Sequence, residues 1–304
     1  MRRLLIVGMA SIVALAGCAP REPADGPAGT GAGSVVTSVR PPPSTQVSIS
    51  TPETLPVTTT STTITSSPTT TNTPLTPDQA VFQVRIDGGY VPQLVAALRA
   101  PSVTVYADGA VYLSEPDDSW GTPPRLLVGR SDPGEVAAIA TAVAADGLLS
   151  RDFGSPAVTD MPETTVILRG PTGEQTGRVY ALDFGVDFRE GLSDDQVAWR
   201  TQLRTLVDDL RALATDPREW TPEQVRVLTV PYGNEPNGSE AVWPGPDLAQ
   251  TQSTPRWPDG CLGVTQGASE LYAAARANSS ATWATAGGPM TLAVVAVLPG
   301  EPLC

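Results

Sequence analysis

The chain of 304 residues contains no histidine and no lysine, so all 19 of its basic residues are arginine. Several classes of catalyst need one of these missing side chains. A Ser-His-Asp or Cys-His site has no base here, and Gly-Lys-Ser phosphate loops, lysine Schiff bases, serine-lysine penicillin-recognising sites and kinases have no lysine. Zinc sites that use histidine are excluded for the same reason. The composition therefore favours a protein that is not an enzyme.

Without lysine, the two Asp-Phe-Gly triplets at residues 152–154 and 183–185 are not kinase elements. We expect both to mark the ends of local structure, where glycine adopts a positive φ angle at little cost.

Basic residues are fewer than acidic ones, and all of them are arginine. The chain has 32 acidic residues and a formal net charge of −13, which becomes −15 if residues 1–17, with Arg2 and Arg3, are removed. Nucleic acid and anionic wall polymers carry negative charge as well, so they do not attract an acidic chain by nonspecific electrostatics. We therefore expect no nucleic-acid partner.

Long apolar runs are absent except near the N-terminus, where Leu4–Ala14 follow Arg2 and Arg3. This run falls short of the roughly 20 residues that a spanning helix needs, and it ends in Leu15-Ala16-Gly17-Cys18. A positive segment, an apolar segment and small residues before the cut are typical of a signal peptide. The pattern predicts a signal peptide over residues 1–17, exported by the general route rather than the twin-arginine route.

The cysteine that ends this motif is placed to receive a diacylglyceryl group and become the new N-terminus. Leu-Ala-Gly-Cys resembles the lipobox of bacterial lipoproteins, and that resemblance implies lipidation at Cys18. Two or more acyl chains would hold the protein persistently at the outer face of the cytoplasmic membrane. The alternative is an unmodified exported protein that carries a cysteine near its cleavage site.

The remaining cysteines are Cys261 and Cys304. Outside the cell they are the one intramolecular pair available, so we expect a disulfide. Two free thiols or an intermolecular bridge are the alternatives.

Residues 18–77 are rich in Thr, Ser and Pro and poor in aromatic residues. Such a segment cannot bury enough apolar area to offset its ordering entropy, so we expect a disordered stalk. The stalk is either an O-glycosylated spacer or an unmodified linker. Residues 78–304 are left as the extracytoplasmic domain, with a subdivision near residue 218 as an option.

Strand and helix signals alternate in this domain. We expect three hairpins: residues 103–113 around Asp108-Gly109, residues 163–169 with 177–184, and residues 281–285 with 290–298. We expect helices from Asp132 to Gly147, from Ser193 to Leu213 and from Ala268 to Ala277. Hairpins interrupted by two to three packed helices predict an α+β fold with an antiparallel sheet.

The C-terminal section carries Trp257-Pro258, Cys261, Trp283 and the ending Leu298-Pro-Gly-Glu-Pro-Leu-Cys304. With the Asp-Gly hairpin and the lipobox, it resembles a family of uncharacterised actinobacterial cell-envelope lipoproteins. The resemblance implies an envelope location and provides no catalytic residue.

Candidate sites in the domain are weak. Asp183 with Asp187, or Glu163 with Asp160, would suit a carboxylate-dependent glycan hydrolase if the paired side chains lie at the correct separation. Asp117-Asp118 and Asp194-Asp195 lack the ligand spacing of a calcium loop. Trp243, Trp257 and Trp283 are expected to pack in a core rather than to form a platform for sugar or peptide.

Taken together, these features favour a membrane-anchored extracytoplasmic lipoprotein. Its domain is expected to act as a non-enzymatic binding or scaffold module for an envelope protein or wall component, without metal or cofactor. The alternatives are a cell-wall glycan hydrolase and a solute-binding lipoprotein.

Overall fold

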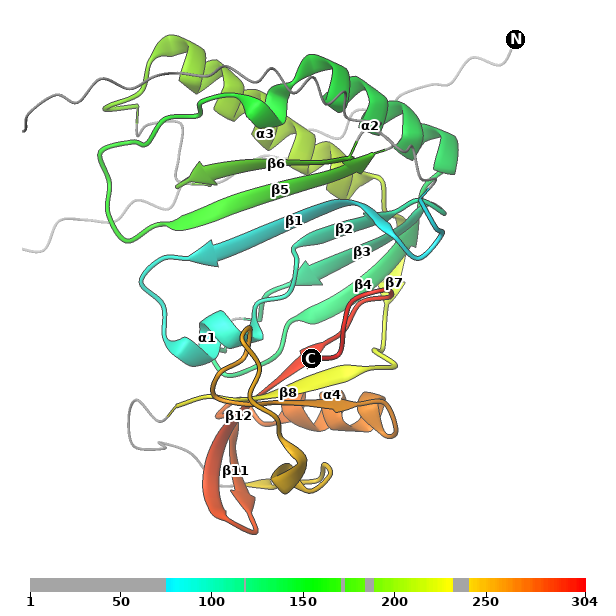
Figure 1. The fold of residues 1–304 in the computed structure, drawn as a ribbon, viewed down its shortest axis with the longest axis vertical. Coiled ribbons are helices and arrows are strands. Elements are labelled where there is room, and N and C mark those ends of the chain that lie inside the picture. Colours follow the sequence, from blue (N-terminus) through cyan, green and yellow to red (C-terminus); the bar gives the residue numbers. More distant parts are fainter. Residues whose placement is uncertain (1–74, 118, 171–172, 184–188, 232–240) are drawn as a thin grey trace, which may run out of the picture. The chain divides into compact units, whose positions relative to one another are not determined.

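The computed structural model describes residues 75–117, 119–170, 173–183, 189–231 and 241–304. The expected signal peptide, Cys18 and the stalk as far as residue 74 lie outside these residues. Residues 66–304 form one compact unit. Its described part is an α+β fold with two sheets and four α-helices (Figure 1), which confirms the expected fold class.

The first sheet has seven strands in the order β6-β5-β1-β2-β3-β4-β7, and all neighbouring strands are antiparallel. The strands are β1 (Ala80–Gly88), β2 (Val103–Tyr106), β3 (Ala110–Glu115), β4 (Arg125–Arg130), β5 (Pro162–Gly170), β6 (Gly173–Tyr180) and β7 (Thr215–Glu219). The hairpin expected at residues 103–113 is formed by β2 and β3. Its turn needs Gly109, which has φ +83° and whose Cβ, if it had one, would lie 2.2 Å from the Ser131 carbonyl oxygen.

The second hairpin exists, but the sequence-based register of its second strand was wrong. We expected residues 177–184, whereas β6 begins at Gly173 and pairs with β5 from Gly170 onward. β5 ends at Gly170 and β6 begins at Gly173, and these two residues are already paired. Phe184 lies outside the described residues.

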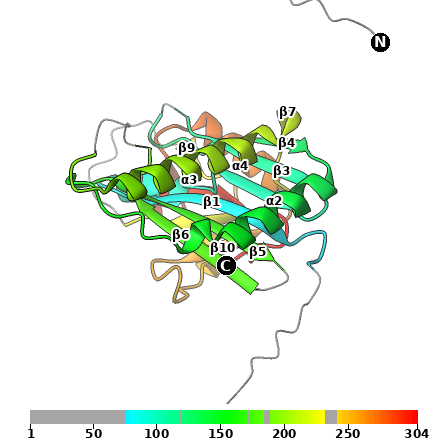
Figure 2. The same ribbon diagram turned by 90° about the horizontal axis from the view of Figure 1, so that it is seen from above.

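Two helices cover one face of the seven-stranded sheet, α2 (Pro133–Asp146) and α3 (Asp194–Ala212) (Figure 2). Both begin where the sequence predicted. The Asp132 carboxylate accepts hydrogen bonds from the amides of Gly134 and Glu135 at the start of α2, and Ser193 and Gln196 form a reciprocal capping box on α3. In α2 the Glu135 carboxylate accepts a hydrogen bond from the Ser131 hydroxyl.

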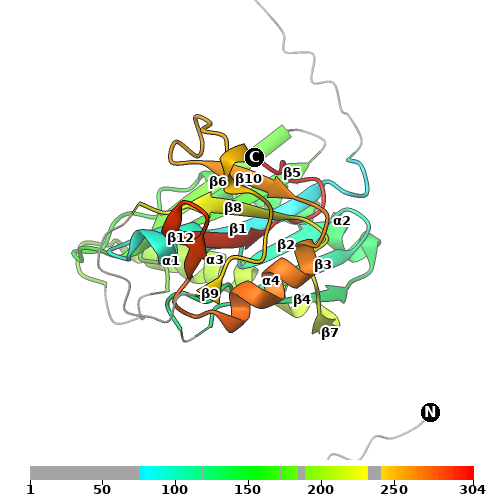
Figure 3. The ribbon, with the colours of Figure 1, turned by 90° about the horizontal axis from the view of Figure 1, so that it is seen from below.

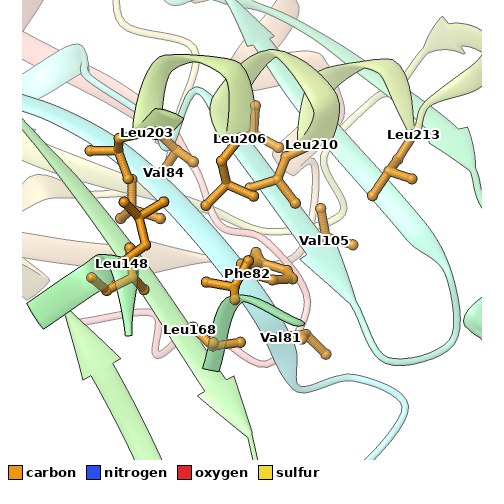
Figure 4. Close-up of a cluster of buried hydrophobic side chains, with 14 of the residues drawn as sticks. Val81, Phe82, Val84, Val105, Leu148, Leu168, Leu203, Leu206, Leu210 and Leu213 are labelled. Carbon is orange, nitrogen blue, oxygen red and sulfur yellow. The ribbon is translucent and has the colours of Figure 1, made fainter. Parts of the chain in front are cut away.

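A stripe of leucines along α3 forms the centre of the core on this face. Figure 4 shows these leucines over the sheet, together with Phe82 of β1. The buried members of the stripe are Leu203, Leu206, Leu210 and Leu213, and Trp199 is partly buried. A 3₁₀ turn, η1 (Leu148–Ser150), adds Leu148 and Leu149 to the same core.

One buried charge was not expected from the sequence. The guanidinium of Arg200 in α3 donates to the carbonyl oxygens of Phe153, Gly154, Tyr180 and Ala181 at 2.7–3.4 Å. Burial, with the nearby charge of Arg204, lowers the pKa of Arg200. Gly154 has φ +63°, as expected for the first Asp-Phe-Gly triplet, whereas Gly185 of the second triplet lies outside the described residues. The first Asp-Phe-Gly triplet therefore ends a short segment whose carbonyl oxygens, at Phe153 and Gly154, accept hydrogen bonds from Arg200.

The second sheet has five strands in the order β10-β8-β12-β11-β9. The strands are β8 (Val225–Thr229), β9 (Ala241–Val242), β10 (Cys261–Val264), β11 (Thr282–Thr285) and β12 (Gly288–Ala296), and a 3₁₀ turn, η2 (Leu248–Gln250), follows β9. The β11–β12 hairpin occurs where it was expected. The β9–β11 pair is parallel, which the sequence did not indicate.

The second sheet is packed between two helices. The expected helix α4 (Ala268–Ala277) contacts β8 and β12 (Figure 3) and contributes Leu271 and Tyr272 to a core with Trp283. A short helix that was not expected, α1 (Gln93–Leu98), contributes Leu98 to a separate apolar cluster that includes Leu228 of β8. The chain between β1 and β2 therefore crosses from one sheet to the other.

The C-terminal segment, residues 297–304, joins the two sheets. Tyr106 of β2 donates its hydroxyl to the Pro299 carbonyl oxygen at 2.8 Å, and Gln83 of β1 donates to the Glu301 carboxylate at 3.2 Å. The same carboxylate pairs with Arg226 of β8 at 3.0 Å. Burial, followed by the charge of Glu301, raises the pKa of Tyr106. Contacts from both sheets therefore meet on one short segment.

Candidate functional site

The candidate ligand site is a cleft of about 420 Å³, which we call the Trp120 cleft. Its walls come from the end of β1, from α1 and from the β3–β4 loop. The apolar walls are formed by Ile86, Val91, Pro92, Val95 and Leu98, and Ser102, Ser114 and Thr122 contribute hydroxyl groups. A mostly apolar concavity of this volume with a few convergent polar groups is typical of a ligand site.

The α1 side of the cleft begins with two glycines in the left-handed region, Gly88 at φ +71° and Gly89 at φ +77°. At Gly89 any Cβ would lie 3.1 Å from the Pro162 backbone nitrogen, so the chain turns tightly against the start of β5. The Tyr90 amide then donates to the Asp160 carbonyl oxygen at 3.1 Å. The turn thus directs residues 91–98 along the cleft.

The opposite side is the loop at residues 116–124, which is anchored to α4. Tyr272 donates its hydroxyl to the Pro124 carbonyl oxygen at 2.7 Å, and Arg276 pairs with Asp117 at 3.6 Å. Burial raises the pKa of Tyr272, so its hydroxyl remains a donor. Gly121 lies so close to residue 279 that a Cβ would be 2.0 Å from the Ser279 carbonyl oxygen. The loop is held by these contacts.

Trp120 is nevertheless 72 % exposed on this anchored loop. Among the described residues, the strongly exposed large hydrophobic side chains are Tyr90, Trp120 and Val242. One of these three, Trp120, lines the cleft. An exposed tryptophan at an apolar concavity indicates an interaction site rather than random surface composition.

The charges at the cleft are mainly positive. Arg99 and Arg211 line it, and Arg99 also donates to the Gly88 carbonyl oxygen at 2.6 Å. Asp117, which also lines the cleft, is paired with Arg276. In a chain with a net charge of −13, two arginines beside an apolar wall favour a ligand with an acidic group.

The sequence missed Trp120 because it belongs to no apolar periodic run. Its neighbours Ser119, Gly121 and Thr122 are typical of a loop. A tryptophan within such a polar segment was the available signal, since tryptophan in a loop lacks a local reason to be buried.

Those three tryptophans differ in their surroundings. Trp283 is buried and meets Trp243 edge to face, with ring centroids 5.3 Å apart, as expected for core packing. Trp243 also donates from Nε1 to the Pro246 carbonyl oxygen at 2.9 Å. Trp257 is partly buried and packs against the apolar cluster that includes Leu98 and Leu228. Its ring centroid also lies 5.9 Å from the Arg226 guanidinium and 5.2 Å from that of Arg256.

Cys261 and Cys304 form a disulfide, as expected from the sequence. The bond connects β10 to the end of the C-terminal segment. Cys18 lies outside the described residues, so its lipidation stays a prediction.

Of the candidate carboxylates, the structure describes Asp160, Glu163 and Asp183. The Glu163 carboxylate pairs with Arg178 at 3.2 Å. Asp183 is exposed at the end of the described segment before residue 184, and Asp187 lies outside the described residues. Both candidate carboxylate pairs therefore stay hypotheses from the sequence.

The candidate calcium ligands also have local explanations. Asp194 and Asp195 occupy the first turn of α3, where carboxylates favour the positive end of the helix dipole. Asp117 is ion-paired, and Asp118 lies outside the described residues. Among the residues whose positions are described, no three His, Cys, Asp or Glu side chains gather as a metal site would require.

No protein-family model, curated protein or solved structure matches the chain. The resemblance to actinobacterial envelope lipoproteins therefore stays a prediction. Within the described part of the chain, no helix has the length and apolar character needed to cross a bilayer.

Proposed function

We propose that the protein is a lipid-anchored extracytoplasmic binding module of the cell envelope and that the Trp120 cleft is its binding site. Export and anchoring are supported by the N-terminal motif ending at Cys18. The Cys261–Cys304 disulfide supports an oxidising compartment, where such bonds persist. The observation that carries the binding role is the exposed Trp120 on a firmly anchored loop beside an apolar cleft.

The proposed ligand is an amphiphile with an apolar body and an acidic head group. The aliphatic side chains of the cleft would contact the body, and Trp120 would cover it. Arg99 and Arg211 would receive the acidic group, since arginine pairs well with carboxylate and phosphate oxygens. This role requires no general base, which agrees with a chain that lacks histidine and lysine.

Anchoring is tested by replacing Cys18 with serine in the full chain. We expect the wild-type protein in the membrane fraction and the Cys18→Ser variant in the soluble fraction, because two or more acyl chains give persistent binding and none remain in the variant. Cys304→Ser is the matched control and should stay in the membrane fraction. Retention of Cys18→Ser in the membrane would refute the anchor.

Binding is tested with anilinonaphthalene sulfonate, a fluorescent probe with apolar rings and one anionic group, on the soluble Cys18→Ser chain. We expect saturable binding that Trp120→Ala weakens at least about fivefold, as for an aromatic residue that dominates an interface. Val242→Ala is the matched control, because Val242 is 78 % exposed but lies outside the cleft. Equal weakening by both substitutions would contradict the assignment.

The head-group preference is tested by competition against the same probe. Dodecanoate should displace the probe more effectively than dodecyltrimethylammonium, which has the same chain and the opposite charge. Arg211→Gln should reduce that difference. If the cationic amphiphile or an uncharged apolar peptide competes as well as dodecanoate, the proposed ligand chemistry is wrong.

A further inference from the structure

A smaller cavity, of about 190 Å³, lies between the two sheets and adjoins the Trp120 cleft, with which it shares Arg99 and Ala100 as lining residues. We call it the Arg226 cavity. Arg85 comes from β1, Arg99 follows α1, and Arg226 comes from β8; Asp87, Trp257 and Glu301 complete the polar lining. Residues far apart in the chain therefore bring three guanidinium groups to one small space.

Two buried donors in this lining have no acceptor. Arg226 is 4 % exposed, and its one ion pair uses Nη2, which meets Glu301 at 3.0 Å. Among the described residues, no acceptor lies within hydrogen-bond distance of Arg226 Nε or of Trp257 Nε1. Buried polar groups are nearly always bonded, so two unpaired donors on residues that line the same cavity indicate a missing acceptor.

The charges around the cavity also lack balance. Arg85, Arg99 and Arg226 line it, against the carboxylates of Asp87 and Glu301. Arg256 adds a further positive charge on the Trp257 ring. Burial, together with the charges of Arg256 and Arg85, lowers the pKa of Arg226 despite the opposing charge of Glu301. A bound anion would offset the repulsion between the guanidinium groups and accept hydrogen bonds from Arg226 Nε and Trp257 Nε1.

We propose that the Arg226 cavity binds one small oxyanion, with Arg226 Nε and Trp257 Nε1 as its buried donors. A phosphate or carboxylate group, free or at the end of a larger ligand, has the acceptor oxygens that guanidinium and indole donors require. The cavity volume suits one such group and not a nucleotide. Because Glu301 belongs to the segment that joins the sheets, the bound ion also contacts the junction between them.

The experiment uses the full Cys18→Ser chain, with sodium phosphate or sodium acetate titrated at constant ionic strength set by sodium chloride. A ligand that binds the folded state alone raises the melting temperature in proportion to the logarithm of its concentration once it is in excess. We expect this rise with at least one of the two oxyanions and saturable heat by isothermal titration calorimetry. No response beyond that of chloride for either ion overturns the proposal.

Trp257→Phe removes one donor and keeps an aromatic ring, so the oxyanion should bind about 3- to 10-fold more weakly, as expected for one lost hydrogen bond. Arg85→Gln should weaken binding without touching the buried ion pair. Arg226→Met should abolish binding, and Trp257→Phe and Arg85→Gln keep the test decisive if Arg226→Met fails to fold. The exposed control Arg218→Gln should bind as the wild type does; a loss equal to that of Arg85→Gln overturns the assignment.

Discussion

The Cys261–Cys304 disulfide connects β10 to the segment that joins the two sheets, so its removal should affect more than one loop. Without it, the segment keeps the hydrogen bonds of Tyr106 and Gln83 and the ion pair of Arg226. In the variant these contacts alone would hold the chain end, which would no longer be covalently linked to β10. We therefore expect the double variant Cys261→Ser/Cys304→Ser to fold with a weakened junction between the sheets.

The magnitude follows from the length of the closed loop. The cysteines are 43 residues apart. In the chain-entropy model a loop of this length restricts the unfolded state by about 4 kcal/mol at 25 °C. For a domain of this size about 1 kcal/mol shifts the melting temperature by roughly 2–4 °C, so the double variant should melt about 8–16 °C lower.

Differential scanning calorimetry on the Cys18→Ser chain measures this shift, and adding a reductant to the disulfide-bonded protein should lower its melting temperature similarly. Hydrogen exchange gives a local check, because the amides of Val297 and Glu301 should exchange faster once the end is free. A shift below about 3 °C would refute the loop-entropy reasoning, given the expected size. Two titratable thiols in the native secreted protein would show that the bond does not form.

Three further changes have defined outcomes. Gly300→Ala should destabilise the domain by about 1–3 kcal/mol in urea unfolding, because Gly300 has φ +75° and its added Cβ would lie 2.5 Å from the Asp78 carbonyl oxygen; the control Gly170→Ala has open space. Leu210→Ala should cost about 2–5 kcal/mol in the same assay because Leu210 is fully buried, whereas Trp120→Ala should change stability by at most about 0.5 kcal/mol. Stability should also fall as the pH rises above about 10, because burial raises the folded-state pKa of Tyr106 and Tyr272. Below the pKa that tyrosine has in the unfolded chain, both states are protonated and stability is at its full value. Above that pKa the unfolded chain loses its protons first, which lowers the free energy of unfolding. Tyr272→Phe should reduce that slope in urea unfolding measured across the alkaline range, and an unchanged slope would count against this explanation.

The elements that the sequence predicted well are those whose signals act within a few residues. The Asp132 and Ser193 caps lie at the starts of α2 and α3, and Gly147 ends α2 in the left-handed region. The Asp108-Gly109 hairpin likewise depends on one turn. The errors concern features that depend on contacts between residues distant in the sequence. The register of β6 depends on where pairing begins, and α1 is six residues long and is stabilised by contacts with β12 rather than by its own sequence.

The candidate sites show the same division. Pairing Cys261 with Cys304 needed only a count of cysteines and an exported chain, and the structure contains that bond. Trp120 could be read as a loop residue, but its place at a cleft required the anchoring of that loop on α4. Arg200 and Arg226 are indistinguishable in the sequence from exposed arginines. Their burial follows from the carbonyl oxygens and the carboxylate that the fold places around them.

The sequence by itself determined the composition without histidine and lysine, the capped helices, the tight turns and the cysteine pair. Each of these depends on residue chemistry or on neighbours along the chain. Only the tertiary structure decided which apolar surface stays exposed and which charges are buried, because burial depends on residues distant in sequence that pack together. The Trp120 cleft and the Arg226 cavity both form where α1 passes between the two sheets, and no local pattern encodes that crossing.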